Sequence, residues 1–478
     1  MSSELMSAFE CLQGNILKSH GRDHCTFVFL RFDKGTDNAH KCLAAITARV
    51  GSAKVQWEES RERATRMAEA EAGSETERAR EIARVRAAGT EFVTLLVSAS
   101  GYRALGVAEA DQPDDSAFRR GARYPDTVKC LRDPNPATWQ EEYRSGLDLD
   151  ALLLVAHDDA DELATSVADI EADLTPYCTV AHREQGTAMR LDKEGRWDPN
   201  GEVREHFGFR DGISQPLFFA KDVTGARRWP KGQSSFDPSA QLRLVLAKDP
   251  HGDPYGYGSY FVFRKLRQDV AAFRADRTRL ASELARRGGG AARDFEQLAG
   301  AYLVGRFPDG TPVTCQKEPG LGAVEAFDYD GDDGVRCPHA AHIRKTNPRG
   351  DAEDRENRVV RRGYSYGKVT LDPGPDEDVG LLFLCAQSNI GNGFHTQTII
   401  WANDPGFPVT DTGPDSMIGP RRFDGPHAPT QKWPSRYGCD ENQLFSCPRL
   451  GPWVTLRGAE YFFAPSLAGL RSLAANRR

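Results

Sequence analysis

Leu152-Leu-Leu-Val-Ala-His157 is an apolar run that predicts a strand, and Asp159–Asp173 directly after it predicts a helix. A further strand is expected near Tyr177–His182. The same alternation of strand and helix runs back toward the N-terminus, with strands expected at His24–Phe32 and Glu91–Val97, a helix over Asn38–Val50 and a helix start at Ser98. Because the strands have the pattern of half-buried strands and the connections are short, an antiparallel α+β sandwich with helices on one face is favoured over a doubly wound parallel sheet.

The second half of the chain repeats this order. Strands are expected at Gly256–Arg264, Gly380–Gln387 and Gly458–Pro465, and helices at Arg267–Arg287, Ala291–Val304 and Phe394–Ala402. Two charged or polar stretches interrupt the pattern: Glu58–Ala88 predicts a solvated helical excursion, and Phe307–Arg336 predicts a long loop. Gly225–Ser239 is rich in Pro, Gly and Ser, so it predicts a hinge between two domains, 1–230 and 231–478.

Composition limits the possible functions. The chain has 478 residues, 39% hydrophobic and 27% charged, which is typical of a globular protein long enough for two cores. Its longest apolar runs span about six residues, far short of the about 20 that a membrane helix needs. The net charge of −7 argues against a nucleic-acid binder.

The termini and cysteines predict the compartment. The start, Met-Ser-Ser-Glu-Leu-Met, has neither the basic residues nor the apolar core of a secretory signal. The ten cysteines are scattered, and no pair has the Cys-x-x-Cys spacing of a zinc or thioredoxin-type site or of covalent haem attachment. A reduced, cytoplasmic protein is therefore expected.

One stretch holds an acid among aromatic residues. His206-Phe-Gly-Phe-Arg-Asp-Gly-Ile-Ser-Gln-Pro216 places Asp211 between Gly208 and Gly212, with Phe209 on the apolar wall beside it. Glycines let the backbone turn sharply or pass close to a flat ligand. Asp-Gly is also a common turn signal, so this stretch alone does not decide between a turn and a working acid.

A second stretch, Cys337-Pro-His-Ala-Ala-His-Ile-Arg-Lys-Thr-Asn-Pro-Arg349, indicates a cofactor. Its alanines leave space for something flat beside His342, and three cations (Arg344, Lys345, Arg349) follow closely. An imidazole for iron and cations for two propionates are what a haem requires. A solvated cationic face is the alternative interpretation of the same charges.

Together these stretches resemble the dye-decolourising peroxidases, a family of haem b enzymes. The resemblance rests on motifs that follow in order over nearly the whole chain: Leu12–Leu17, Gly208–Gly212, Cys337–Arg349, Arg361–Gly367 and Arg457–Pro465. Each motif alone is weak, but their joint match is specific.

The resemblance implies a fold, a set of site residues and a reaction. The fold would be two ferredoxin-like α+β halves with antiparallel sheets and haem b between them. Asp211 is similar to the distal acid of the family and Arg361 to its distal arginine, while His342 matches the proximal iron ligand and Asn347 the asparagine of that segment. The enzyme would reduce hydrogen peroxide to water through a ferryl intermediate and oxidise dyes or phenolic reductants one electron at a time.

The residue types fit that reaction. An ionised carboxylate can move a proton between the two peroxide oxygens, directly or through one water. Arg361 stays charged at any working pH and can stabilise the charge that develops as the O–O bond breaks. In the cofactor-binding set we place Arg344, Gly212 and Phe209 beside His342 and Asn347.

Three assignments have competitors. His339 precedes His342 by three positions, and His342 is favoured because it keeps the spacing to Asn347. Arg362 adjoins Arg361, which fits better by its offset from Gly367. Many relatives have an acid in the segment that matches Ser388–Phe394, thought to bond the proximal histidine; here there is none, so the partner is Asn389, Asn392 or a residue elsewhere.

Bulky reductants require a route for electrons from the surface. Trp401, Tyr364 and Tyr366 lie near the motifs in sequence and are candidates for such a relay, although a place in the core is the better interpretation of each.

Two other functions compete with the peroxidase. A haem carrier or an iron-releasing haem protein would need His342 but would have no use for Asp211 and Arg361 together. A two-domain hydrolase would need a Gly-x-Ser-x-Gly elbow, a His-Glu-x-x-His motif or a phosphate loop, and the chain has none of them.

Overall fold

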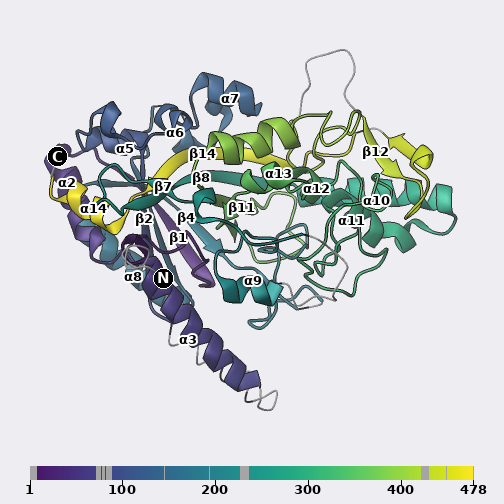
Figure 1. Cartoon of the computed structure of the whole chain (residues 1–478), viewed down its shortest axis with the longest axis horizontal. Coiled ribbons are helices and arrows are strands. Elements are labelled where there is room, and N and C mark those ends of the chain that lie inside the picture. Colours follow the sequence, from purple (N-terminus) through teal and green to yellow (C-terminus); the bar gives the residue numbers. More distant parts are fainter. Residues whose placement is uncertain are drawn as a thin grey trace.

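The computed structural model describes residues 8–71, 77, 81, 89–144, 146–192, 194–226, 236–420, 430–447 and 449–476. Its centre is one antiparallel sheet in which strands from both halves of the chain take part (Figure 1). The predicted helix at Glu58–Ala88 and the predicted hinge at Gly225–Ser239 lie partly outside these residues, and the division at 230 stays a prediction.

The N-terminal half forms a ferredoxin-like unit. Its four strands are β1 (His24–Arg31), β2 (Phe92–Ser98), β3 (Ala151–His157) and β4 (Thr179–Thr187), hydrogen-bonded in the order β2-β3-β1-β4. Every residue of β2 and β3 is buried, which explains their continuous apolar sequences. Helices α2 (Thr36–Thr47) and α8 (Ala160–Leu174) connect these strands, and α8 begins where the Asp159 side chain accepts hydrogen bonds from Asp161 and Glu162 amides.

The C-terminal half repeats this unit. Its strands β8 (Tyr257–Gln268), β10 (Tyr364–Tyr366), β11 (Gly380–Gln387) and β14 (Val454–Ala464) are ordered β14-β8-β11-β10. The two halves therefore have the same strand order, as expected for two ferredoxin-like units.

The two sheets join into a closed barrel instead of a sandwich. Strand β14 pairs with β2, where Phe462 lies opposite Ser98, and β10 pairs with β4, where Ser365 lies opposite Thr187. The expectation of a sandwich with helices on one face was wrong in this respect, because both outer edges of each sheet find a partner strand and no open edge remains between the units.

The barrel interior is a core of aromatic and aliphatic side chains. Phe27 and Phe29 from β1 contact Phe263 from β8, with ring centroids 5.8 and 5.0 Å apart. A second buried cluster lies outside the barrel, where Phe207 and Phe209 pack with Ala340 and Ala341 against α10 (Val270–Gly288). This second cluster brings together the two motifs that are 130 residues apart in the sequence.

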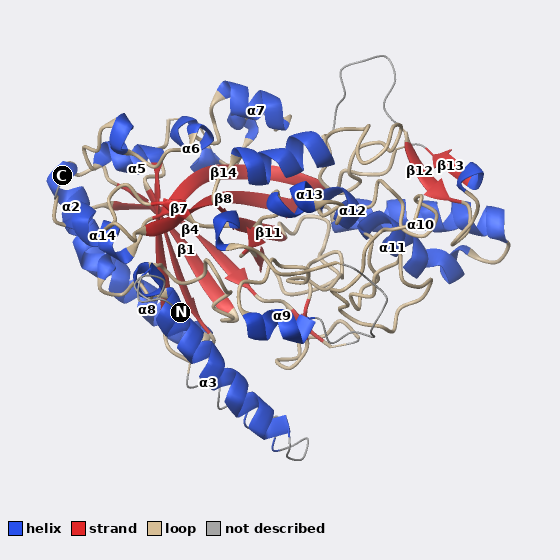
Figure 2. Ribbon diagram, viewed as in Figure 1, coloured by secondary structure: helices blue, strands red, loops and turns tan. Residues whose placement is uncertain are grey.

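The remaining elements surround the barrel (Figure 2). The short strands are β5 (Arg190–Leu191), β6 (Glu202–Val203), β7 (Ala247–Lys248), β9 (Val360–Arg361), β12 (Gln431–Pro434) and β13 (Leu444–Cys447). The helices are α3 (Ala53–Glu71), α5 (Ala99–Ala104), α6 (Ser116–Arg120), α7 (Pro125–Leu131), α9 (Ala220–Ala226), α11 (Glu296–Val304), α12 (His342–Thr346), α13 (Ala352–Glu356), the π-helix η6 (Gly391–Ala402) and α14 (Leu467–Ala474). Helix α3 extends away from the body of the molecule, as a solvated excursion does.

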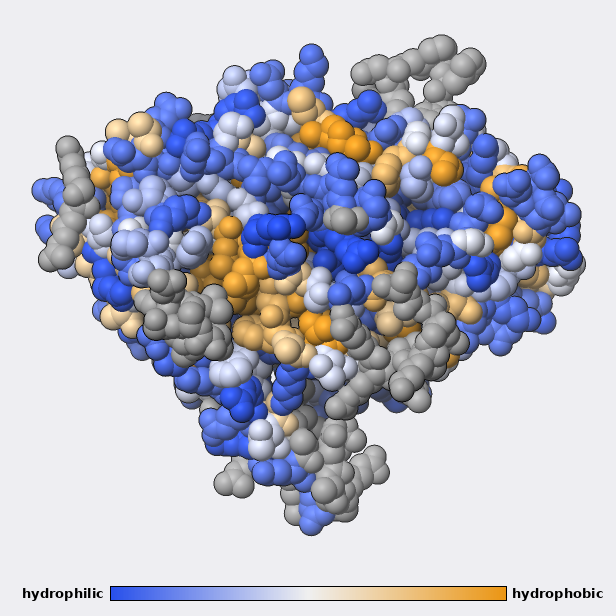
Figure 3. All heavy atoms as spheres, viewed as in Figure 1, coloured by the Kyte–Doolittle hydropathy of each residue, from blue (hydrophilic) through white to orange (hydrophobic). Residues whose placement is uncertain are grey.

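Polar and charged residues cover most of the face in Figure 3, interrupted by an apolar area near its centre. In the described part of the chain, no helix has both the length and the apolar character required to cross a bilayer.

Candidate active site

A cavity of about 990 Å³ lies against the outer face of the barrel. Alternate residues of two barrel strands face it, namely Arg264, Leu266 and Gln268 from β8 and Leu381 and Phe383 from β11. The volume is at the upper end of ligand pockets, which are about 300–1,000 Å³. The cavity is therefore large enough for a cofactor of haem's size.

His342 projects into the cavity from the first residue of α12. Its Nδ1 atom is 2.9 Å from Oδ2 of Asp415, which is completely buried. The other carboxylate oxygen of Asp415 accepts hydrogen bonds from the Met417 and Ile418 amides at 2.7 and 2.9 Å.

The Asp415 carboxylate fixes the tautomer of His342. Although burial opposes ionisation, the histidine and the two amides lower the pKa of Asp415 below its ordinary value. An ionised carboxylate can only accept, so Nδ1 of His342 carries the proton and donates it. The lone pair of Nε2 is then available to a ligand, which is the arrangement of a metal-binding histidine.

His339, the competing histidine, does not line the cavity. Its ring lies against Gly334, and burial lowers its pKa to about 4. Among the described residues, neither Asn389 nor Asn392 bonds His342. Its partner is Asp415, so the expected alternative of a residue elsewhere describes this hydrogen bond, and no pattern in the sequence marks that loop.

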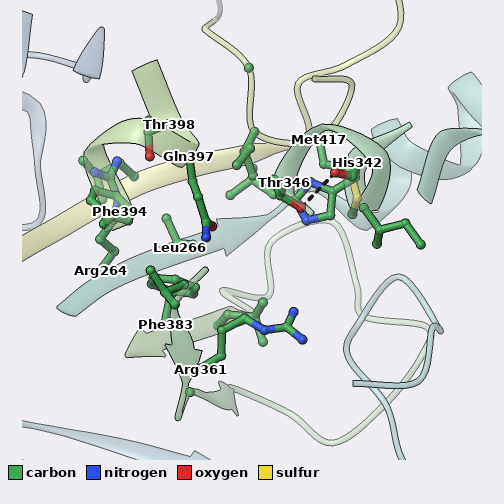
Figure 4. Close-up of a pocket in the computed structure, with 18 of the residues that line it drawn as sticks. Arg264, Leu266, His342, Thr346, Arg361, Phe383, Phe394, Gln397, Thr398 and Met417 are labelled. Atoms are coloured by element: carbon green, nitrogen blue, oxygen red, sulfur yellow. Dashed lines mark hydrogen bonds between the residues drawn. The ribbon is translucent and has the colours of Figure 1, made fainter. Parts of the chain in front are cut away.

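Arg361 faces the cavity from the side opposite His342 (Figure 4). Its guanidinium donates to the carbonyl of Ile213, and its backbone amide donates to Oε1 of Gln215 at 3.0 Å. Arg361 thus contacts the stretch that carries Asp211. Arg362, the competing arginine, is buried and donates instead to the carbonyls of Asn15 and Ile16.

Asp211 lines the cavity and is half-buried. Its Oδ1 accepts from the amide of Gly212 at 2.6 Å. Gly208 and Gly212 have φ angles of 97° and 78°, which favour glycine and explain the spacing of the motif. Phe209 and Gly212 also line the cavity, so the structure brings most of this predicted stretch to the site.

Two buried arginines line the cavity. Arg306 and Arg349 each donate to Oγ of Ser214 at 2.8 Å, and both also donate to backbone carbonyls. Among the described residues, no carboxylate forms an ion pair with either. Burial lowers the pKa of Arg349 to about 9 and also lowers that of Arg306. Such cations favour an anionic ligand, and the two carboxylates of the expected haem are anions of this kind.

The structure does not bring Arg344 to the cavity, so its predicted place among the cofactor ligands is wrong. Its guanidinium donates to the carbonyls of Cys337 and Asp332 and lies 4.7 Å from the ring centre of Tyr329. Lys345 is buried and donates to the carbonyls of Asp404 and Gly413. Asn347 does line the cavity.

The aromatic residues considered for a relay lie in the core. Trp401 is 3% exposed and stacks on Phe407. The Tyr364 hydroxyl donates to the backbone carbonyl of Arg22, and the Tyr366 hydroxyl donates to the carboxylate of Asp378. All three are therefore buried core residues, as the second interpretation of the sequence expected.

Comparison with known proteins gives a consistent result. The model of the DyP dimeric α+β barrel domain matches residues 12–190, and that of the Dyp-type peroxidase C-terminal domain matches residues 235–404. Multifunctional dye peroxidase DyP2 of an Amycolatopsis species is 38% identical over 491 residues, covering 99% of this chain and 97% of that protein. The solved structure of a DyP-type peroxidase from Anabaena has 36% identity and a TM-score of 0.84, and the match covers 98% of this chain and 95% of that one.

A further match covers a smaller part of the chain. Deferrochelatase of Yersinia pestis is 44% identical over 119 residues, which are 21% of this chain and 27% of that protein.

The fold and the two domain matches identify the protein as a peroxidase built on an antiparallel α+β barrel. The chain belongs to the dye-decolourising peroxidase family. It is accordingly a haem-dependent oxidoreductase that acts on dyes.

Proposed function

We propose that the cavity binds haem b with Nε2 of His342 as the iron ligand, and that Asp211 and Arg361 would act on hydrogen peroxide in the same cavity. The observation that carries the proposal is the position of His342, anchored by Asp415 at 2.9 Å, across one cavity from Arg361. Arg306 and Arg349 would hold the haem carboxylates, and Asn347, Gly212 and Phe209 would lie against the cofactor.

Bound haem supplies a redox-active iron. The protein residues supply the proton transfer and the charge. Asp211 would take the proton from one peroxide oxygen and return it to the other, which becomes water. Arg361 would stabilise the negative charge on the departing oxygen, since its guanidinium stays ionised throughout.

Aromatic compounds are the proposed reductants. A relative has been solved in complex with 2,6-dimethoxyphenol, and other relatives are named for decolourising dyes. Because a peroxidase takes one electron at a time from its reductant, readily oxidised phenols and dyes are suitable donors.

We also propose that the enzyme works in the cytoplasm. All ten cysteines, each within the described residues, are free thiols. The Cys42 thiol donates a hydrogen bond to Sγ of Cys178 at 3.3 Å and both cysteines are free, which suits a reducing compartment.

A haem carrier or iron-releasing protein is the second candidate, and the local match to a deferrochelatase favours it. The distal acid and arginine argue for turnover, because a carrier gains nothing from either. Haem-loaded protein mixed with peroxide separates the two functions. A rapid change in the Soret band, followed by its return when a phenol is added, supports the peroxidase; an unchanged band, or loss of iron with the porphyrin intact, refutes it.

A further inference from the structure

Glu205 is a buried carboxylate in the wall of the same cavity, and no step of the proposed reaction uses it. Both of its carboxylate oxygens accept hydrogen bonds from backbone amides of its own loop. Oε2 accepts from the amide of Phe207 and Oε1 from the amide of Phe209, each at 2.9 Å. One side chain therefore holds two alternate amides of the stretch that leads to Asp211.

The backbone closes the same turn. The Glu205 amide donates to the carbonyl of Phe209 at 3.0 Å, and the Gly208 amide donates to the carbonyl of Glu205 at 2.8 Å. Two residues further on, the Asp211 amide donates to the carbonyl of Val203 at 2.9 Å. Asp211 thus lies at the base of a narrow loop whose interior is filled by the Glu205 carboxylate.

Gln268 connects this loop to the barrel. It is the last residue of β8, is 3% exposed and lines the cavity, and its Nε2 donates to Oε2 of Glu205. Its Oε1 is buried and has no hydrogen-bond partner among the described residues. A buried amide oxygen without a partner is costly, which indicates that the donor bond to Glu205 determines the orientation of the Gln268 side chain.

We propose that Glu205 is a positioning residue: its carboxylate, anchored to the barrel through Gln268, fixes the turn that delivers Asp211 to the cavity. This inference rests on the role of Asp211 given above. When ionised, the carboxylate accepts three hydrogen bonds here and donates none, whereas a glutamine in its place always turns a donor toward other donors.

The test uses three variants of the haem-loaded protein and one control. Glu205→Gln removes an acceptor without changing the size of the side chain. The double variant E205Q/Q268E restores a carboxylate on the other side of the same contact. Gln268→Met removes only the anchor and keeps the bonds to Phe207 and Phe209. The control is Glu194→Gln, the same change on the neighbouring turn, where Glu194 is exposed and pairs with Arg196.

We expect E205Q to lower the second-order rate constant for peroxide about tenfold or more, since small displacements of a reacting group have effects of this size. The rate constant for the reductant and the haem content should not change, and the pH dependence of the peroxide step should shift. Q268M should show a smaller loss, the double variant should recover part of the rate, and E194Q should match wild type.

Hydrogen–deuterium exchange of peptides spanning residues 203–212 gives a measurement that does not depend on turnover. In haem-free protein, E205Q should speed exchange in this region, and E194Q should leave it unchanged. Wild-type peroxide kinetics in E205Q, or equal losses in the peroxide and reductant steps, would overturn the proposal. If Asp211→Asn itself leaves the peroxide step unchanged, the proposed function fails instead, which separates the two failures. Should E205Q not fold, wild-type peroxide kinetics in Q268M would still overturn the inference.

Discussion

His342 and Asp415, 73 residues apart, are joined by a hydrogen bond of 2.9 Å between Nδ1 and a fully buried carboxylate. The negative charge makes the imidazole a better electron donor to any metal at Nε2. Asp415→Asn keeps an acceptor for Nδ1 but removes the charge. We expect peroxidase activity to fall about 10- to 100-fold, as for other partners of metal-ligating histidines, and the reduction potential of the haem to rise. Spectroelectrochemistry measures the potential, and Asp404→Asn, an exposed acid nearby, is the control.

Asp211→Asn should leave haem bound but slow the reaction with peroxide, because the amide cannot accept the proton. General acid–base groups contribute about 10²–10⁴-fold, so a loss in this range is expected. Stopped-flow measurement of the Soret change reports the step directly. Asp198→Asn, which lies earlier in the same region and does not line the cavity, should behave as wild type. Equal rates for the Asp211 variant and wild type would contradict the assignment.

Arg361 and Arg362 are adjacent, but their substitution should have different effects on activity and stability. Arg361→Leu removes the guanidinium from the cavity and should reduce the peroxide rate with little effect on unfolding. Arg362→Leu leaves the carbonyls of Asn15 and Ile16 without their donor and should destabilise the fold, by about 1–3 kcal/mol per buried group. Thermal unfolding and stopped-flow kinetics on both variants separate the roles; a stable but inactive Arg362 variant would reverse the assignment.

The elements that were predicted correctly have local signals. Strand β11 was predicted with the bounds that the structure has, because Gly380–Gln387 is a continuous apolar run. The Asp211 loop was predicted from the spacing of Gly208 and Gly212, and in the structure both glycines have positive φ. The closure of the barrel has no such signal, since it depends on pairs such as Ser365 with Thr187, which are far apart in the sequence.

The errors at the site have a geometric reason. Arg344 follows His342 by two positions, and on a helix of 3.6 residues per turn that places the two side chains about 200° apart. Thr346, four positions after His342, does face the cavity. Asp415 and Arg306 come from distant loops, where no periodic pattern marks a side chain as pointing inward.

Arg349 should contribute to haem affinity through charge. Arg349→Leu should weaken haem binding by about tenfold, since the loss of one charge-assisted hydrogen bond is worth roughly 1.5–3 kcal/mol at most. Haem dimethyl ester, which has no carboxylates, provides the matched probe: wild type should bind it more weakly than haem, and the variant should show a smaller difference between the two. Titration of haem-free protein measures both affinities. An equal preference for haem in wild type and variant would show that Arg349 does not bind a propionate.

The pH dependence of stability should include a contribution from Glu205. Burial raises its pKa to about 7, against the lowering by the Phe207 and Phe209 amides and Gln268. The nearby charge of Asp211 raises the pKa further. Between the ordinary value of 4.5 and about 7, the folded protein therefore binds more protons than the unfolded chain.

The contribution of Glu205 to the free energy of unfolding is fully present below pH 4.5 and declines as the pH rises to about 7. At about 1.4 kcal/mol per pKa unit, the decline is on the order of 3 kcal/mol. Glu205→Gln should flatten this part of the profile, which denaturant unfolding at a series of pH values measures. Because Gln cannot ionise, a variant profile with the same slope as wild type would assign the titration to another group.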